Sequence, residues 1–151
     1  RMGEMLEYTY VNGNAYGTTK KSVEEARAKG KNVILDVDTI GAMKIRALCP
    51  DATLIYILPP SWDELKSRLS STGIYNEEEV NALMEIAEEE ISCANSYDYI
   101  LVNDTISNTL SRFAQIIHSN RYSRNCMKEF LDSYIDGEVK PHVQSYKEAL
   151  L

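Results

Sequence analysis

Three short apolar runs, separated by segments with helical spacing, limit the fold of this chain more than any other feature. They cover residues 32–38, 52–58 and 99–102. Each run is short for a helix and apolar at successive positions, as strands covered on both faces of a parallel sheet are. Strands that alternate with helices predict an α/β fold, in which right-handed crossovers build a parallel sheet with flanking helices.

Polar side chains lie at the carboxyl ends of two of these runs, at the sheet edge where α/β proteins bind ligands. Asp36 and Asp38 end the first run, and Asn103 and Asp104 follow the third. Two residues apart on a strand, Asp36 and Asp38 would share one face, where they repel each other unless a cation or an arginine lies nearby. Alternatively, this strand end caps a helix expected to begin at Gly41.

Shorter signals predict the remaining elements. Residues 5–11 alternate between apolar and polar and indicate a strand, which a turn at Asn12-Gly13-Asn14 follows. Residues 19–29 favour a helix that ends at Gly30. Capping boxes predict two further helix starts, at Ser61 with Glu64 and at Asn76 with Glu79. The apolar stripes of two later helices are Leu110, Phe113 and Ile117, then Met127, Phe130, Leu131 and Tyr134.

Composition argues against several classes of function. The net charge of −7 disfavours a nucleic-acid surface. No apolar run approaches the length of a membrane span and the N-terminus has no signal-peptide core, so no membrane partner is expected. The cysteine pattern favours a reducing, cytoplasmic location. Cys49, Cys93 and Cys126 lie far apart without histidine at ligand spacing, which disfavours disulfides and zinc. His118 and His142 are isolated and offer no acid–base mechanism.

Four segments, in order along the chain, resemble the guanylate kinase family. They are Gly13-Asn14-Ala15-Tyr16-Gly17-Thr18, Asp36-Val37-Asp38-Thr39-Ile40-Gly41, Pro59-Pro60-Ser61 with Arg68 and Gly73, and Tyr97-Asp98-Tyr99 with Val102-Asn103-Asp104. Four ordered motifs are far more specific than a single one. The resemblance covers roughly residues 3–121 and implies a P-loop nucleoside-monophosphate-kinase-like core with a small GMP-binding β element and a helical lid.

The resemblance also implies a division of the chain and an activity. Residues 3–18 would belong to the GMP-binding subdomain, 19–70 and 81–121 to the core, 71–80 to the lid and 122–151 to a C-terminal helical extension. The implied reaction is phosphoryl transfer from ATP to GMP, with Mg²⁺ accompanying ATP. The sequence leaves oligomeric state open, a homo-oligomer included.

On the GMP side, the resemblance implies roles for four residues. Glu7 would accept hydrogen bonds from N1 and N2 of guanine, a donor pair that adenine lacks. Tyr16 would donate its hydroxyl to the GMP phosphate, Thr18 would bind the base, and Asp38 would face GMP. From position alone, the favoured interpretation of Glu7 is a solvated residue on a strand face, and the alternative for Tyr16 is a half-buried strand aromatic.

On the ATP side, the resemblance implies roles for three residues. Arg68 would face the ATP phosphates as a lid arginine, and Asp36 would support the metal or an arginine near the phosphates. Asn103 would contact the adenine side. Arg68 is equally a solvated helix residue and Asn103 a turn former. A site with carboxylates and no histidine suits phosphoryl transfer, which needs positioning and charge neutralisation more than acid–base groups.

The sequence also departs from the family pattern. It has no Gly-x-x-x-x-Gly-Lys-Ser/Thr loop, the cradle for ATP phosphates, and we expect upstream residues or a swapped strand to complete the sheet between residues 33–38 and 53–58. Ile40 replaces a glutamine, and Thr72 and Leu83 replace arginines. Two alternatives therefore remain: a catalytically impaired guanylate-kinase-like module that binds nucleotide or protein, and a kinase for another nucleoside monophosphate.

Overall fold

A computed structural model describes residues 5–11 and 14–137, without the side chains of residues 9–11 and 14–16. The chain divides into two compact units, Arg1–Val102 and Asn103–Leu151. Within the described ranges, no helix is both long enough and apolar enough to span a bilayer.

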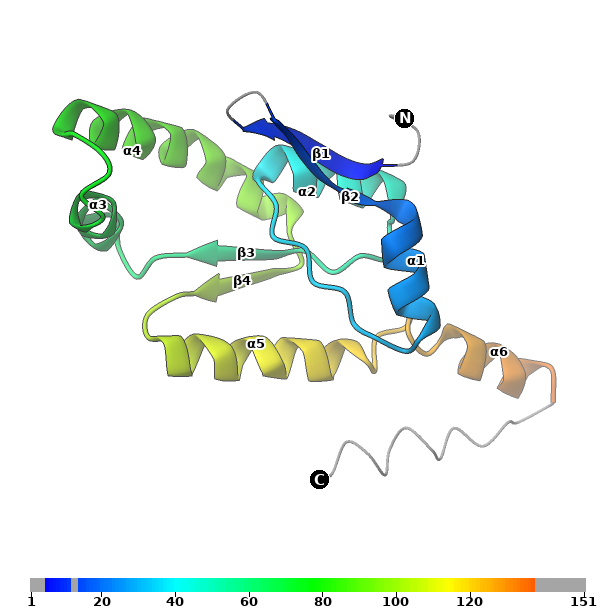
Figure 1. Cartoon of the computed structure of the whole chain (residues 1–151). Coiled ribbons are helices and arrows are strands. Elements are labelled where there is room, and N and C mark those ends of the chain that lie inside the picture. Colours follow the sequence, from blue (N-terminus) through cyan, green and yellow to red (C-terminus); the bar gives the residue numbers. More distant parts are fainter. Residues whose placement is uncertain (1–4, 12–13, 138–151) are drawn as a thin grey trace. The chain divides into compact units, whose positions relative to one another are not determined.

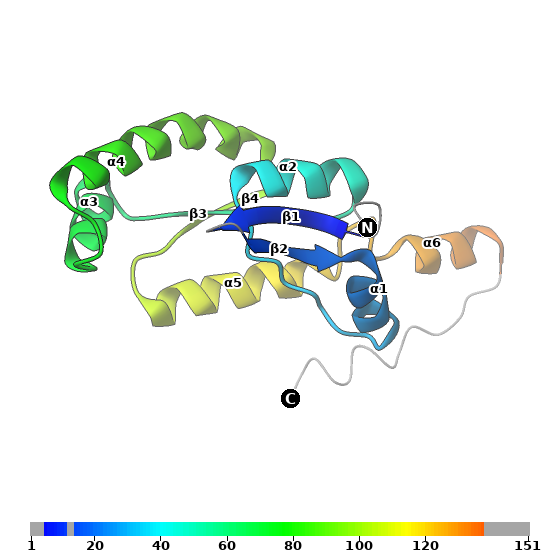
Figure 2. The same ribbon diagram turned by 45° about the horizontal axis from the view of Figure 1, so that its top comes forward.

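The first unit begins with an antiparallel hairpin, which confirms the strand predicted from alternation. Strand β1 (Met5–Val11) pairs with β2 (Asn14–Thr19), and the predicted turn at residues 12–13 lies outside the described residues. The hairpin contacts helix α2 (Thr39–Leu48), beside which it lies in Figures 1 and 2. Because a lone hairpin is marginally stable in water, this contact supports it.

Helix α1 (Lys20–Ala28) follows the hairpin as predicted. The Thr19 side chain accepts a hydrogen bond from the backbone N–H of Ser22, which satisfies one of the unpaired donors of the first turn. Gly30 has φ of 72°, a conformation that costs glycine little, so the helix ends where the sequence indicated.

A parallel strand pair confirms the predicted α/β class. Strand β3 (Ile55–Leu58) pairs in parallel with β4 (Tyr99–Val102), side by side in Figure 1. The crossover between them contains α3 (Trp62–Ser71), α4 (Glu77–Ile91) and the short 3₁₀ helix η2 (Ser92–Ser96).

The strand predicted over residues 32–38 is wrong for this structure. Residues 31–38 run without strand pairing, and Ile34 is 66% exposed. An apolar run becomes a strand only where a neighbour supplies the hydrogen-bond ladder, and the described sheet containing β3 and β4 has two strands. The run therefore marks a segment suited to a strand rather than a strand formed here.

Helix starts follow side-chain caps, with two differences from expectation. Helix α2 begins at Thr39, two residues before Gly41, because Asp38 Oδ1 accepts from the N–H of Gly41 at 2.6 Å. Asn76 and Glu79 form the predicted capping box at α4. At α3 only half of the predicted box is present: Ser61 accepts from the N–H of Glu64, whose carboxylate instead accepts from Arg68.

An ion pair joins α2 to the start of the parallel sheet. Asp98 Oδ2 accepts from Arg46 Nη2 at 2.6 Å and from the N–H of Leu54 at 2.8 Å. Arg46 Nη1 also donates to the carbonyls of Pro50 and Ala52 at 3.2 and 3.0 Å. One carboxylate thus fixes both a helix and the backbone that leads into β3.

We expect Asp98→Ala to lower the free energy of unfolding by about 1–2 kcal/mol, measured by urea denaturation. The substitution leaves the Leu54 N–H and the Arg46 guanidinium without their carboxylate, and the partial exposure of the pair moderates the cost. Asp51→Ala, at an exposed position nearby, is the control and should change stability by less than about 0.5 kcal/mol. Equal effects of the two substitutions would show that the ion pair contributes nothing specific.

The second unit contains helices α5 (Ile106–Asn120) and α6 (Lys128–Ile135). Phe113 and Ile117 are half-buried as predicted, but Leu110 is 61% exposed. Exposed apolar residues on α6 also differ from expectation: Leu131 at 47% and Tyr134 at 57%. Helical spacing predicts which face is apolar, whereas burial depends on the neighbours that cover it.

Candidate functional site

Two of the residues predicted to bind GMP meet across the hairpin. Glu7 on β1 and Thr18 on β2 are cross-strand partners, and Thr18 Oγ1 donates to Glu7 Oε1 at 3.2 Å in a partly buried setting. The strand register shifts between Met5 and Glu7, an irregularity of the kind that redirects a side chain next to a site. The hydrogen bond limits the rotation of the carboxylate and leaves it on the same hairpin face as the threonine.

Gly17 permits this close pairing of the strands. A Cβ added at Gly17 would meet the backbone carbonyl of Glu7 and lie 2.8 Å from Cα of Tyr8. Any other residue would push β2 away from β1 and disturb the Glu7–Thr18 pair. The glycine of the sequence motif therefore has a structural reason in the spacing of the two strands.

Tyr16, the third predicted GMP ligand, lies on β2 opposite Thr9. It is two residues from Thr18, so the strand places both positions on one face. The side chain of Tyr16 lies outside the described residues, and its role stays a prediction.

Asp36 and Asp38 lie on the unpaired segment that leads into α2. Asp38 caps that helix, as the alternative interpretation held, and its carboxylate faces the start of α2. Asp36 is exposed, and because the segment is not a strand, the expected shared strand face is absent. Among the described residues, no group of three or more His, Cys, Asp or Glu side chains is placed to hold a metal ion.

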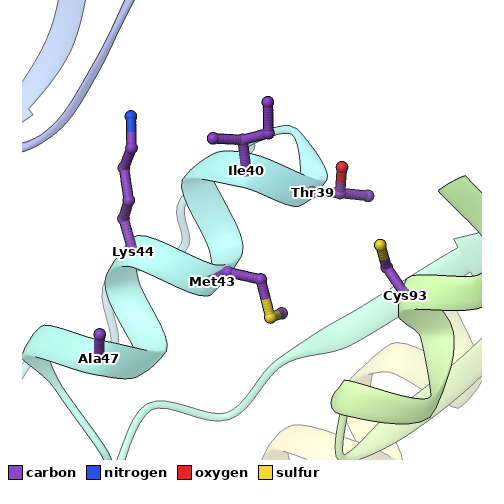
Figure 3. A pocket seen from close by; sticks show the side chains of 6 residues that line it. All are labelled: Thr39, Ile40, Met43, Lys44, Ala47 and Cys93. Carbon is purple, nitrogen blue, oxygen red and sulfur yellow. The ribbon is translucent and has the colours of Figure 1, made fainter.

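An open pocket lies beside the start of α2. It has a volume of about 450 Å³ and is mostly apolar (Figure 3), with Thr39, Ile40, Met43, Lys44, Ala47 and Cys93 along its walls. Figure 3 shows Thr39 on α2 and Cys93 on η2 pointing toward each other. The Nζ atom of Lys44, on the same helix, lies 5.5 Å from the centre of the Tyr8 ring on the hairpin.

Side chains to which the sequence analysis gave no role connect this region to α4. Thr39 Oγ1 donates to Glu90 Oε1 at 3.3 Å across 51 residues of sequence. The rings of Tyr56 and Tyr97 meet edge to face at 5.0 Å. Burial raises the pKa of the Tyr56 hydroxyl, and the charges of Glu90 and Cys93 raise it further. Glu90 lies in a run of three glutamates, and no sequence signal distinguishes it from the other two.

The three positions that the resemblance links to arginines in or near the lid have structural partners of their own. Arg68 Nε donates to Glu64 Oε1 at 2.7 Å, one turn earlier on α3. Thr72 Oγ1 donates to the carbonyl of Leu69 at 2.8 Å and accepts from the N–H of Ile74. Leu83 is half-buried on α4, which contacts α3.

Asn103 and its neighbour Asp104 belong to the second unit. Asn103 Oδ1 accepts from Thr109 Oγ1 at 3.0 Å on α5. The backbone N–H of Thr105, followed by the side chains of Asn108 and Arg112, lowers the pKa of Asp104. Both residues thus stabilise the first turn of α5, and an adenine contact by Asn103 stays a prediction.

Comparison with known proteins identifies the family. Residues 1–120 match the family model described as guanylate kinase. The guanylate kinase of Clostridium acetobutylicum is 39% identical over 142 residues, which cover 93% of this chain and 66% of that protein. The guanylate kinase of Francisella tularensis subsp. tularensis is 44% identical over 116 residues, which cover 76% of this chain and 61% of that protein.

Structural comparison agrees with the sequence. The crystal structure of guanylate kinase from Anaplasma phagocytophilum matches with a TM-score of 0.64 at 32% identity, over 81% of this chain and 58% of that one. The chain therefore spans roughly three fifths to two thirds of the length of these relatives. Since the family model covers residues 1–120 of 151 and the fold matches, the chain belongs to the guanylate kinase family.

Proposed function

We propose that this chain forms the GMP-binding and lid part of a guanylate kinase that transfers a phosphoryl group from ATP to GMP. The observation that carries the proposal is the Glu7–Thr18 pair, a carboxylate held by a hydroxyl on one hairpin face. Guanine presents two adjacent donors, at N1 and N2, and a carboxylate accepts from both. Adenine has no such pair, so this arrangement favours GMP over AMP.

The remaining predicted residues complete the proposal. Tyr16 and Asp38 would contact GMP, and Arg68 and Asn103 would contact ATP. Mg²⁺ commonly binds one or two carboxylates together with substrate phosphates and waters, which fits the exposed carboxylate of Asp36 better than a cage of protein ligands. When bound with ATP, Mg²⁺ neutralises charge that develops on the phosphates. Asp36 would hold the ion or an arginine near those phosphates.

The residues in and near the lid favour a second function, binding without efficient catalysis. Arg68 is paired with Glu64, and Thr72 and Leu83 stand where the family has arginines. Fewer cations near the phosphates weaken transition-state stabilisation, which is the main catalytic contribution in phosphoryl transfer. The alternative is therefore a nucleotide-binding or protein-interaction module with impaired catalysis.

The complete natural protein, assayed with ATP and Mg²⁺, should phosphorylate GMP in preference to AMP, CMP and UMP. ADP release in a coupled assay measures turnover, and thermal unfolding measures binding. GMP at a hundred times its dissociation constant should stabilise the protein by about 2.7 kcal/mol, whereas AMP at the same concentration should give little shift.

The same assay separates the alternatives. Stabilisation by GMP without turnover favours the impaired module. Turnover with another nucleoside monophosphate favours the third interpretation, a kinase of different base preference. Neither turnover nor selective stabilisation by GMP would contradict the proposed function.

A further inference from the structure

One hydrogen bond connects the helix that follows the lid turn to the start of the helix next to the GMP side. Thr39 Oγ1, at the first residue of α2, donates to Glu90 Oε1, near the end of α4. The contact is partly buried and joins residues 51 positions apart. It is therefore a tertiary contact between two elements rather than a local helix interaction.

The position of Thr39 gives this contact its importance. The residue directly follows Asp38, whose carboxylate caps α2 through the N–H of Gly41 at 2.6 Å. Fixing the Thr39 side chain fixes the first turn of α2 and, with it, the point where the Asp38 side chain leaves the backbone. A hydrogen bond on the neighbouring residue thus restrains a side chain that it does not touch.

Glu90 and Asp38 both contribute to the pKa of one side chain, that of Tyr97. Burial is the largest cause that raises the pKa of the Tyr97 hydroxyl. Electrostatic interactions raise it further, in the order Tyr56, Cys93, Glu90 and Asp38. The Tyr97 ring packs edge to face on Tyr56 of β3, with the ring centres 5.0 Å apart. The hydrogen bond from Thr39 Oγ1 limits the rotamers that the Glu90 side chain can adopt.

We propose that Glu90 is a positioning residue for GMP, acting through Thr39 on the first turn of α2 and on Asp38. The proposal rests on the proposed function, in which Asp38 faces GMP. Loss of Glu90 would let the start of α2 sample several positions, and GMP would lose affinity because it must order that turn on binding. ATP would be less affected, since two of its three proposed contacts, Arg68 and Asn103, lie elsewhere in the chain and the third, Asp36, precedes the first turn of α2.

Steady-state kinetics and GMP calorimetry on the complete natural protein test this inference. Glu90→Ala should raise the KM and Kd for GMP about tenfold, with the KM for ATP within about twofold. Glu90→Gln keeps an acceptor oxygen for Thr39 and should restore most of the affinity. Thr39→Val removes the donor and should match Glu90→Ala, and the double variant should be no worse than either single one, as expected for partners of one interaction.

Glu88→Ala is the matched control, an exposed glutamate on the same helix, and should leave all constants unchanged. Unchanged GMP binding in Glu90→Ala, additive effects in the double variant, or no rescue by glutamine would each overturn the positioning role. Equal weakening of GMP and ATP would also overturn it and assign Glu90 to general stability. If the unmodified protein binds no GMP, the proposed function fails together with this inference, whereas GMP binding that is insensitive to Glu90 overturns this inference alone.

Discussion

The Glu7→Ala variant of the complete natural protein should lose about 100-fold or more in kcat/KM for GMP. Each hydrogen bond to a charged group contributes about 1.5–3 kcal/mol, and the substitution removes two of them from the guanine edge. At about 1.4 kcal/mol for each factor of ten, this loss reaches the stated size. Because Glu7 contacts only the base in this proposal, the KM for ATP should stay within about twofold.

Two further variants sharpen the interpretation of Glu7. Thr18→Val removes the hydroxyl that donates to Glu7 Oε1 at 3.2 Å, so it should lower GMP selectivity, but less than Glu7→Ala does. Glu24→Ala, an exposed glutamate on α1, is the control and should have no effect. A Glu7→Ala enzyme that still prefers GMP over AMP would rule out a base-reading role for this residue.

Restoring arginine at Thr72 and Leu83 together should raise kcat, by up to about 10³-fold if one arginine reaches the transferred phosphoryl group. The gain should appear in kcat more than in the KM for GMP, because these cations act on charge that develops in the transition state. Rapid-quench measurement of the chemical step on the complete natural protein is the direct test.

The structure shows what this double substitution costs. Thr72 supports the turn through hydrogen bonds to Leu69 and Ile74, and Leu83 is half-buried beside α3. A loss of thermal stability is therefore expected, and Thr72→Gln with Leu83→Gln is the control for lost packing without added charge. If the unmodified protein already turns over at rates typical of kinases, about 1–100 s⁻¹, other cations occupy this role and the interpretation of both positions is wrong.

Local patterns predicted the elements whose stability is local. Alternation over residues 5–11 identified β1, Gly30 identified the end of α1, and Asn76 with Glu79 identified the start of α4. In each case the residues that make the signal also make the hydrogen bond or turn. The pairing of Glu7 with Thr18 is local in the same way, since both belong to one hairpin, whereas their proposed roles come from the family resemblance.

Features that depend on distant partners were not predictable in this way. An apolar run over residues 32–38 indicates a strand but does not supply the neighbour whose ladder makes one. Glu90 is chemically identical to the glutamates beside it, and only the fold shows that it faces Thr39. Likewise, helical spacing placed Leu110 on an apolar face, but among the described residues its side chain is 61% exposed.

The hairpin has a consequence for how the protein folds and diverges. Glu7 and Thr18 are 11 residues apart in the sequence. Leu54 and Asp98, which are hydrogen-bonded just before the first residues of the parallel strands, are 44 residues apart. Each doubling of loop length adds about 0.6 kcal/mol of closure entropy, so the parallel pair costs about 1.2 kcal/mol more to bring together. The pair proposed to recognise the base therefore comes from one short stretch of chain and has a low entropic cost of closure. Because β1 and β2 form a sheet of their own, separate from β3 and β4, we expect substitutions in the parallel pair to leave the Glu7–Thr18 register unchanged.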